Sequence, residues 1–144
     1  MATFDMDNYA LRSTVPPTPV DNGDYKGVVR NSYDQLNTVA ATHTTGSIFN
    51  IGELLPGERF LGGEIVHAAH GSSRTLKVGI AGADDQFLAA TSIAAAGSLE
   101  LRAMTGFGYR NTTKSPIPII ATLGGAAAAT ASPGFKVALR IGRN

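Results

Sequence analysis

The three histidines are the side chains of this sequence that could most readily do chemistry. Two of them, His67 and His70, stand three positions apart in "HAAH". On a helix this spacing would place both imidazoles on one face, where they could ligate a metal ion. The pair instead follows the apolar stretch "EIV" and precedes "GSS", a context that favours a strand with the two rings on opposite faces. We therefore expect no metal site here. His43 stands alone in a Thr-rich stretch, and we expect a solvated strand or turn residue.

Two adjacent carboxylates, Asp84 and Asp85, follow the segment "GIAGA". A calcium loop needs further oxygen ligands at alternating positions, and the neighbouring residues Ala83, Gln86 and Phe87 do not supply such a series. A turn or a helix cap is the favoured interpretation.

The remaining groups that could do chemistry show no catalytic arrangement. The glutamates lie in unrelated segments without an aromatic platform beside them, and the chain has no tryptophan; they are Glu53, Glu58, Glu64 and Glu100. The segment "GFGYR" at residues 106–110 lacks the following helix that a phosphate-binding loop requires. No Gly-x-Ser-x-Gly nucleophile motif is present. The sequence therefore predicts a protein without catalytic activity, cofactor, metal or small-molecule substrate.

Composition limits the protein class further. The 144 residues suit one domain, and the absence of cysteine excludes disulfides and thiolate metal sites. The twelve basic residues are scattered and the net charge is only +1, which argues against a nucleic-acid partner. The N-terminus has no signal-peptide pattern, and no apolar run reaches the ~20 residues of a membrane span, so we expect a soluble chain.

Residues 1–26 are polar and irregular, with a proline-rich centre, "VPPTPVDNGDYKG". Prolines hold such a segment extended, so we predict an N-terminal arm and not a helix. Apolar residues are spaced along it, and we interpret them as anchors that bind a partner surface: Phe4, Tyr9, Leu11, Val15 and Tyr25. The alternative is a tail that folds back over its own domain.

Residues 27–144 are predicted to form an all-β body, a β-sandwich or jelly-roll-like domain, because short apolar segments alternate with turn residues every 8 to 14 positions. The alternation is clearest in residues 75–80 and 135–141, where one face is apolar and the other carries Lys77 or Lys136 and Arg140. The predicted strands cover residues 28–43, 47–54, 59–69, 75–81, 98–104, 108–112, 116–124 and 134–142.

Two segments are harder to assign. Residues 84–97 favour a helix by composition, with Gly97 as its stop, although an extended segment is nearly as well supported. Pro116 and Pro118 place the next strand at a sheet edge or at a strand start, where their missing donors are not needed. The tract "GGAAAATASPG" is then predicted to be the tip of a hairpin that joins two antiparallel neighbours.

Three segments together resemble the small head proteins of tailed bacteriophages, the decoration or cement proteins. They are "LLPGERFLGGEIVHA", "SRTLKVGIAGADDQFLAAT" and "GFGYRNTTKSPIPIIATLGGAAAATASPGFKVALRI", and the resemblance covers roughly 90 of the 144 residues. Residues before Gly27 depart from the pattern.

The resemblance implies a body, made in the host cytoplasm, that sits on the outer capsid surface of the virion. It implies a homodimer or homotrimer that contacts the major capsid protein and stabilises contacts between capsomers. A head-fibre or tail-associated protein is the structural alternative, although neither repeats nor heptads are visible. A carbohydrate-binding jelly-roll module is the alternative from a different class, but the chain has few aromatic residues for a sugar platform.

Overall fold

A computed structural model describes residues 3–5, 29–71, 73–102, 108–126 and 131–143 of the chain. Every regular element among them is a strand. The strands are β1 Thr3–Asp5, β2 Val29–Val39, β3 Ile48–Leu54, β4 Glu58–His67, β5 Thr75–Ile80, β6 Ala83–Ser92, β7 Gly97–Leu101, β8 Tyr109–Arg110, β9 Ile117–Gly124 and β10 Ser132–Arg143.

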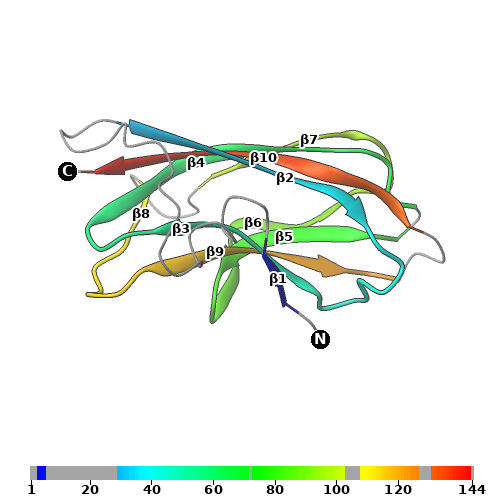
Figure 1. Ribbon diagram of the computed structural model, residues 1–144, viewed down its shortest axis with the longest axis horizontal. Helices are drawn as coiled ribbons and strands as arrows, with labels where there is room; N and C mark the ends of the chain where they lie inside the picture. Colours follow the sequence, from blue (N-terminus) through cyan, green and yellow to red (C-terminus); the bar gives the residue numbers. More distant parts are fainter. Residues whose placement is uncertain (1–2, 6–28, 72, 103–107, 127–130, 144) are drawn as a thin grey trace.

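Two sheets lie face to face, which confirms the predicted β-sandwich (Figure 1). The first sheet has the order β1-β3-β9-β5-β6, and the second has the order β2-β10-β4-β7, with β8 also paired to β4. All pairs are antiparallel except β1 with β3. Stacked sheets of this kind lie about 10 Å apart, so their facing side chains form a single apolar layer.

Aromatic rings join the two sheets within this layer. Phe49 of β3 meets Phe135 of β10 edge to face at 5.4 Å between ring centroids. Phe60 of β4 packs on Phe87 of β6 at 4.1 Å. All four rings are 1% exposed or less. Such pairs contribute favourable edge and stacking energy beyond the burial of their apolar area.

The predicted alternation is confirmed in both clear cases. Leu76 and Val78 are fully buried in β5, and the apolar positions of β10 from Phe135 to Ile141 are 2% exposed or less. Lys136 and Arg140 lie on the exposed side of the same strand.

The helix considered for residues 84–97 does not form, because residues 83–92 are strand β6. β6 pairs with β5 along its length, with register shifts, and buries Phe87 between the sheets. Pairing and burial of one apolar face therefore outweigh the helical preference of Ala and Leu, as tertiary context commonly does.

The predicted hairpin of the two C-terminal strands is wrong. β9 is a central strand of the first sheet, whereas β10 belongs to the second, so the chain changes sheet after β9 ends at Gly124. At the start of this crossing Gly125 has φ +75°, and a Cβ there would lie 1.7 Å from the carbonyl oxygen of Ser73. Glycine is therefore required for the exit from β9.

The prolines do mark a strand start, but β9 is not an edge strand. β9 begins at Ile117, and Pro118 pairs only with Glu53 of β3, since the pairing with β5 starts at Ile119. The missing amide donor of Pro118 therefore interrupts no complete ladder.

Residues 3–5 of the predicted arm form β1, which extends the first sheet along β3 through the pairs Thr3 with Ile48 and Asp5 with Asn50. The predicted anchors Tyr9, Leu11, Val15 and Tyr25 lie outside the described residues. For the predicted anchor Phe4, the structure describes the backbone, which pairs with Phe49 in the register of β1 with β3.

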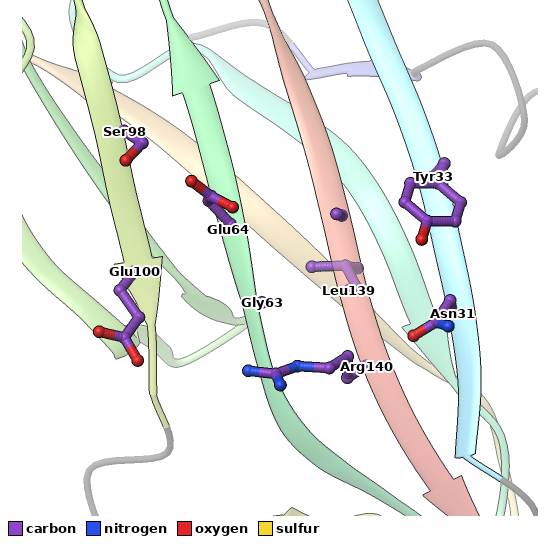
Figure 2. A pocket seen from close by; sticks show the side chains of 9 residues that line it. Asn31, Tyr33, Gly63, Glu64, Ser98, Glu100, Leu139 and Arg140 are labelled. Carbon is purple, nitrogen blue, oxygen red and sulfur yellow. The ribbon is translucent and has the colours of Figure 1, made fainter.

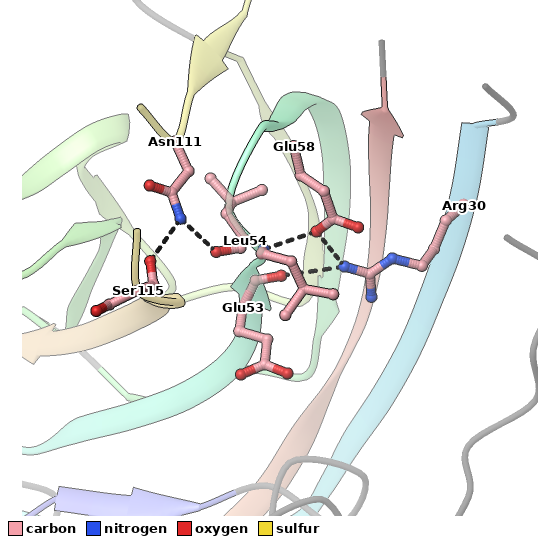
Figure 3. A network of polar contacts seen from close by, with 7 residues as sticks. Arg30, Glu53, Leu54, Glu58, Asn111 and Ser115 are labelled. Atoms are coloured by element: carbon pink, nitrogen blue, oxygen red, sulfur yellow. Dashed lines mark hydrogen bonds and ion pairs between the residues drawn. The ribbon is translucent and has the colours of Figure 1, made fainter. Parts of the chain in front are cut away.

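A buried ion pair closes one end of the sandwich (Figure 3). The Arg30 guanidinium of β2 lies 2.6 Å from the Glu58 carboxylate of β4, with side chains 12% and 6% exposed. The same Glu58 oxygen accepts the amide of Leu55, and Arg30 also donates to the carbonyl of Glu53 at 3.2 Å. These contacts tie both sheets to the turn between β3 and β4.

Asn111 supports this turn from the other side. Its fully buried amide donates to the carbonyls of Leu54 and Ser115, both at 2.8 Å (Figure 3). Its backbone exchanges hydrogen bonds with Gly57 and Glu58. The polar groups here satisfy one another, which is the arrangement expected of a structural network.

We predict that Glu58→Ala lowers the free energy of unfolding by about 3–5 kcal/mol, because it leaves the Arg30 charge buried without its carboxylate. Glu100→Ala is the matched control, since it removes an exposed ion pair with Arg102 whose side chains are 58% and 75% exposed. That change should cost far less, because water and salt screen an exposed pair. Chemical denaturation measures both, and equal losses would contradict a structural role for the buried pair.

Candidate interaction surface

The side chains that could do chemistry do not come together in a reactive centre in the described part of the chain. His67 and His70 were expected on opposite faces, but their ring centroids lie 6.2 Å apart. The expectation fails because β4 ends at His67, so strand alternation does not extend to His70. Both side chains are buried, and their Nδ1 atoms face the carbonyl of Ala68 and the hydroxyl of Ser132, each at 2.9 Å.

His43 is buried and not solvated as expected, with 8% of its surface exposed. Its Nδ1 accepts the amide of Ala40 at 3.1 Å, and its ring meets Phe49 edge to face. Arg74, 2% exposed, donates to the carbonyl of His43 at 3.0 Å. Histidine and arginine here hold the turn between β2 and β3 against the start of β5.

Asp84 and Asp85 form neither a helix cap nor a turn, because both belong to β6. Asp84 pairs with Lys77 of the neighbouring strand β5 at 2.7 Å. In the described ranges no group of three or more His, Asp or Glu side chains is placed to hold a metal ion. In "GFGYR", Gly108 precedes β8, which consists of Tyr109 and Arg110, and residues 106–107 lie outside the described part. No helix in the described part is long and apolar enough to cross a membrane.

The most developed surface is the outer side of the second sheet, which we call the exposed face. Its outward side chains come from four neighbouring strands: Asn31, Tyr33 and Gln35 of β2; Lys136, Ala138 and Arg140 of β10; Glu64 and Val66 of β4; Ser98 and Glu100 of β7. The strand register arranges them in rows. One row runs Tyr33, Ala138, Glu64, Glu100.

Small residues make this face hollow. A depression of about 510 Å³ lies over Gly63 and Ala138, between Tyr33 on one side and the two glutamates on the other (Figure 2). A second depression of about 390 Å³ lies further along the face, beside Gln35 and Val66. The Tyr33 side chain is 65% exposed.

The charges of the exposed face are unusual for a sheet. Glu64 and Glu100 are direct cross-strand neighbours, and like charges in that position destabilise a sheet. The hydrogen bond from Arg102 at 2.6 Å lowers the pKa of Glu100, and the charge of Arg140 acts in the same direction. Glu100 therefore remains ionised, which does not suit the proton donor of a glycosidase.

Sequence reasoning did not find this face. It identified Lys136 and Arg140 as outward residues but placed Glu64 and Glu100 in unrelated segments. Their proximity depends on the register of β4 with β7, which connects residues 36 positions apart and has no local sequence signal.

The fold and surface define a two-sheet β-sandwich with a hollow, charged outer face. Among solved structures, it is similar to a chain of the capsid asymmetric unit of cyanophage Pam1, with a TM-score of 0.65 and 24% identity over 88% of this chain and 93% of that chain. It is similar to a chain of the capsid of Ralstonia phage GP4, with a TM-score of 0.64 and 19% identity over 88% and 90%. A chain of the acidic stable capsid of Helicobacter pylori bacteriophage KHP30 has a TM-score of 0.56 and 13% identity over 80% and 87%.

Neither protein-family models nor curated protein sequences give a significant match to this chain. The structural comparisons show that the sandwich is a fold found in phage capsid structures.

We predict that acid destabilises the protein between pH 6.5 and 5. Burial lowers the pKa of His43 and of His70; the Arg74 charge adds to the effect at His43, and the His67 and Arg74 charges add to it at His70. Below pH 6.5, the ordinary pKa of histidine, the unfolded chain therefore binds more protons than the folded chain. Stability is complete above that pH and is lost as the pH falls toward the lowered pKa, by at most about 1.4 kcal/mol per pH unit for each group.

Urea unfolding midpoints between pH 7.5 and 5 measure this loss. The double variant His43→Gln/His70→Gln should lose less stability over the same range than the parent chain. An equal loss in both proteins would assign the acid sensitivity to other groups.

Proposed function

We propose that this chain is a virion structural protein that binds the outer surface of a phage capsid and stabilises contacts between capsomers. The observation that carries the proposal is the structural likeness, over 88% of this chain, to chains of two phage capsid structures. The resemblance of the sequence to decoration proteins supports the same function. The groups that could do chemistry form buried structural contacts or exposed surface pairs in the described residues, which suits a non-enzymatic protein.

Multivalent binding explains how a small sandwich would stabilise a shell. Once one copy binds, an associated copy meets its own site at high effective concentration, so modest contacts suffice. A protein that binds the assembled lattice and not the dispersed subunits stabilises the lattice by mass action. The major capsid protein is the partner in this account.

Residues 3–5 of the predicted arm add strand β1 to the chain's own first sheet. The arm residues that follow, 6–26, would add contact area to the capsid. Ordering an extended segment costs conformational free energy, and apolar anchors such as Tyr9, Leu11 and Tyr25 would offset that cost.

A carbohydrate-binding module is the alternative function of a different class. Sugar sites of sandwich proteins rely on exposed aromatic platforms. Among the described side chains, Tyr33 is the one large aromatic group counted as exposed. A single ring of this kind gives weaker support to a sugar site than the fold gives to a capsid role.

We predict that the full chain cosediments with phage heads that lack it, and that a chain without residues 1–26 folds but loses at least tenfold in affinity. The loss follows from the removal of the apolar anchors. Gel densitometry of pelleted heads measures the occupancy, and circular dichroism checks the fold of the shortened chain.

A matched control is the full chain with Asp85→Lys, an exposed change in β6 that should leave binding unchanged. Full occupancy by the shortened chain would reject the role of the arm. Failure of the full chain to bind heads at all would reject the proposed function.

A further inference from the structure

Three charged side chains of the exposed face form no direct ion pair in the described part of the chain, and Arg140 acts on Glu100 only at longer range. Lys136 and Arg140 of β10 and Glu64 of β4 take part in no ion pair or side-chain hydrogen bond there. Glu64 in addition faces Glu100 across the strands, so its neighbour repels it. The face therefore presents unpaired charges of both signs in adjacent strands.

The charges of the exposed face of one copy are complementary to the charges of the same face on a second copy. Lys136 and Arg140 flank Ala138 along one side of β10, and Ala138 pairs with Glu64 of β4. A small residue with a cation two positions before it and another two positions after it forms a depression that fits a carboxylate. Figure 2 shows Arg140 extending from β10 across β4, close to the glycine pair of that strand.

We propose that the exposed face binds a second copy of this chain, face to face, about a two-fold axis parallel to the strands and between β10 and β4. This axis places β4 of one copy over β10 of the other. Glu64 then lies over the partner's Ala138, between the partner's Lys136 and the partner's Arg140. The contact is repeated by symmetry, as an isologous interface requires.

Charge selects this arrangement over the other two-fold arrangement of the same faces. An axis across the strands would place β10 over itself, so Lys136 and Arg140 would oppose the same cations of the second copy. Aligned packing of two sheets is a common geometry, and it tolerates the twist of each sheet.

The size and composition of the face suit a dimer. The strands β2, β4 and β10 have 11, 10 and 12 residues and β7 has 5. At about 4.8 Å between strands they give a projected area of roughly 600 Å², of the order of the ~800 Å² per partner in a stable interface. Val66 of β4, 49% exposed, supplies apolar surface beside the axis, and Tyr33 of the edge strand β2, 65% exposed, supplies aromatic surface at the rim.

The edge of this sheet is a poorer site for a second copy. β2 is the long edge strand, but the Asp34 carboxylate accepts the backbone amide of Gln35 at 2.8 Å. A side chain that occupies an edge amide opposes the addition of another strand.

This inference deepens the proposed function, because a dimer would give the multivalency on which capsid binding rests. The test of the dimer uses the isolated full chain. The dimer can therefore be rejected while capsid binding is found, and capsid binding can be rejected while the dimer is found. Light scattering after size exclusion should give twice the 14.9 kDa mass of one chain.

Two charge-reversal variants test the pairing. Glu64→Lys alone and Lys136→Glu/Arg140→Glu alone should each raise the dimer dissociation constant at least tenfold, because each places like charges together across the axis. An equimolar mixture of the two variants should restore a dimer that contains one chain of each, detected by native mass spectrometry. Asp85→Lys, on the other sheet, is the control with the same type of change and should remain dimeric.

A parent chain that is a monomer at 100 µM or a cyclic trimer would overturn the inference. So would variants that stay dimeric, or a mixture that yields no mixed dimer although circular dichroism shows both variants folded. Restoration in the mixture alone supports it, since a merely unfolded variant would not recover.

Discussion

The structure depends on the apolar layer between the two sheets. The Phe49–Phe135 and Phe60–Phe87 contacts join strands that are far apart in sequence, and nearly every inward side chain beside them is fully buried. Burial of this layer is the main favourable term for a chain that has no cysteine for disulfides. Because the core is completed within one chain, the outward side chains of the second sheet are not needed to form it.

That division separates stability from binding. The largely buried groups Arg30, Glu58 and Asn111 form an ion pair and hydrogen bonds at the end of the sandwich, where they fix the turn between β3 and β4. Outward charges such as Glu64 and Arg140 contribute little to a monomer and remain available to a partner. Under the proposed function, the charged outer face is the part of the sandwich that takes part in repeated contacts.

Local patterns predicted most of the strands, because alternation of apolar and polar residues is a property of adjacent positions. The same reasoning failed where distant contacts decide. Residues 84–97 carry helical composition, but pairing with β5 makes most of them a strand. β9 and β10 are consecutive in the sequence yet lie in different sheets. The residue types between them do not indicate this change of sheet. The approach of His67 to His70 and of Glu64 to Glu100 follows from a strand end and from register, which are likewise non-local. The arm anchors at Phe4, Tyr9, Leu11, Val15 and Tyr25 remain predictions.

Cryo-electron microscopy of purified virions tests the central claim most directly, since it asks whether many copies of this sandwich occupy a shell. The account predicts density of about this fold at symmetry-related positions on the outer capsid surface, with adjacent copies in contact with capsid subunits. Particles that lack this density, or that carry the protein only inside the head or in the tail, would contradict it.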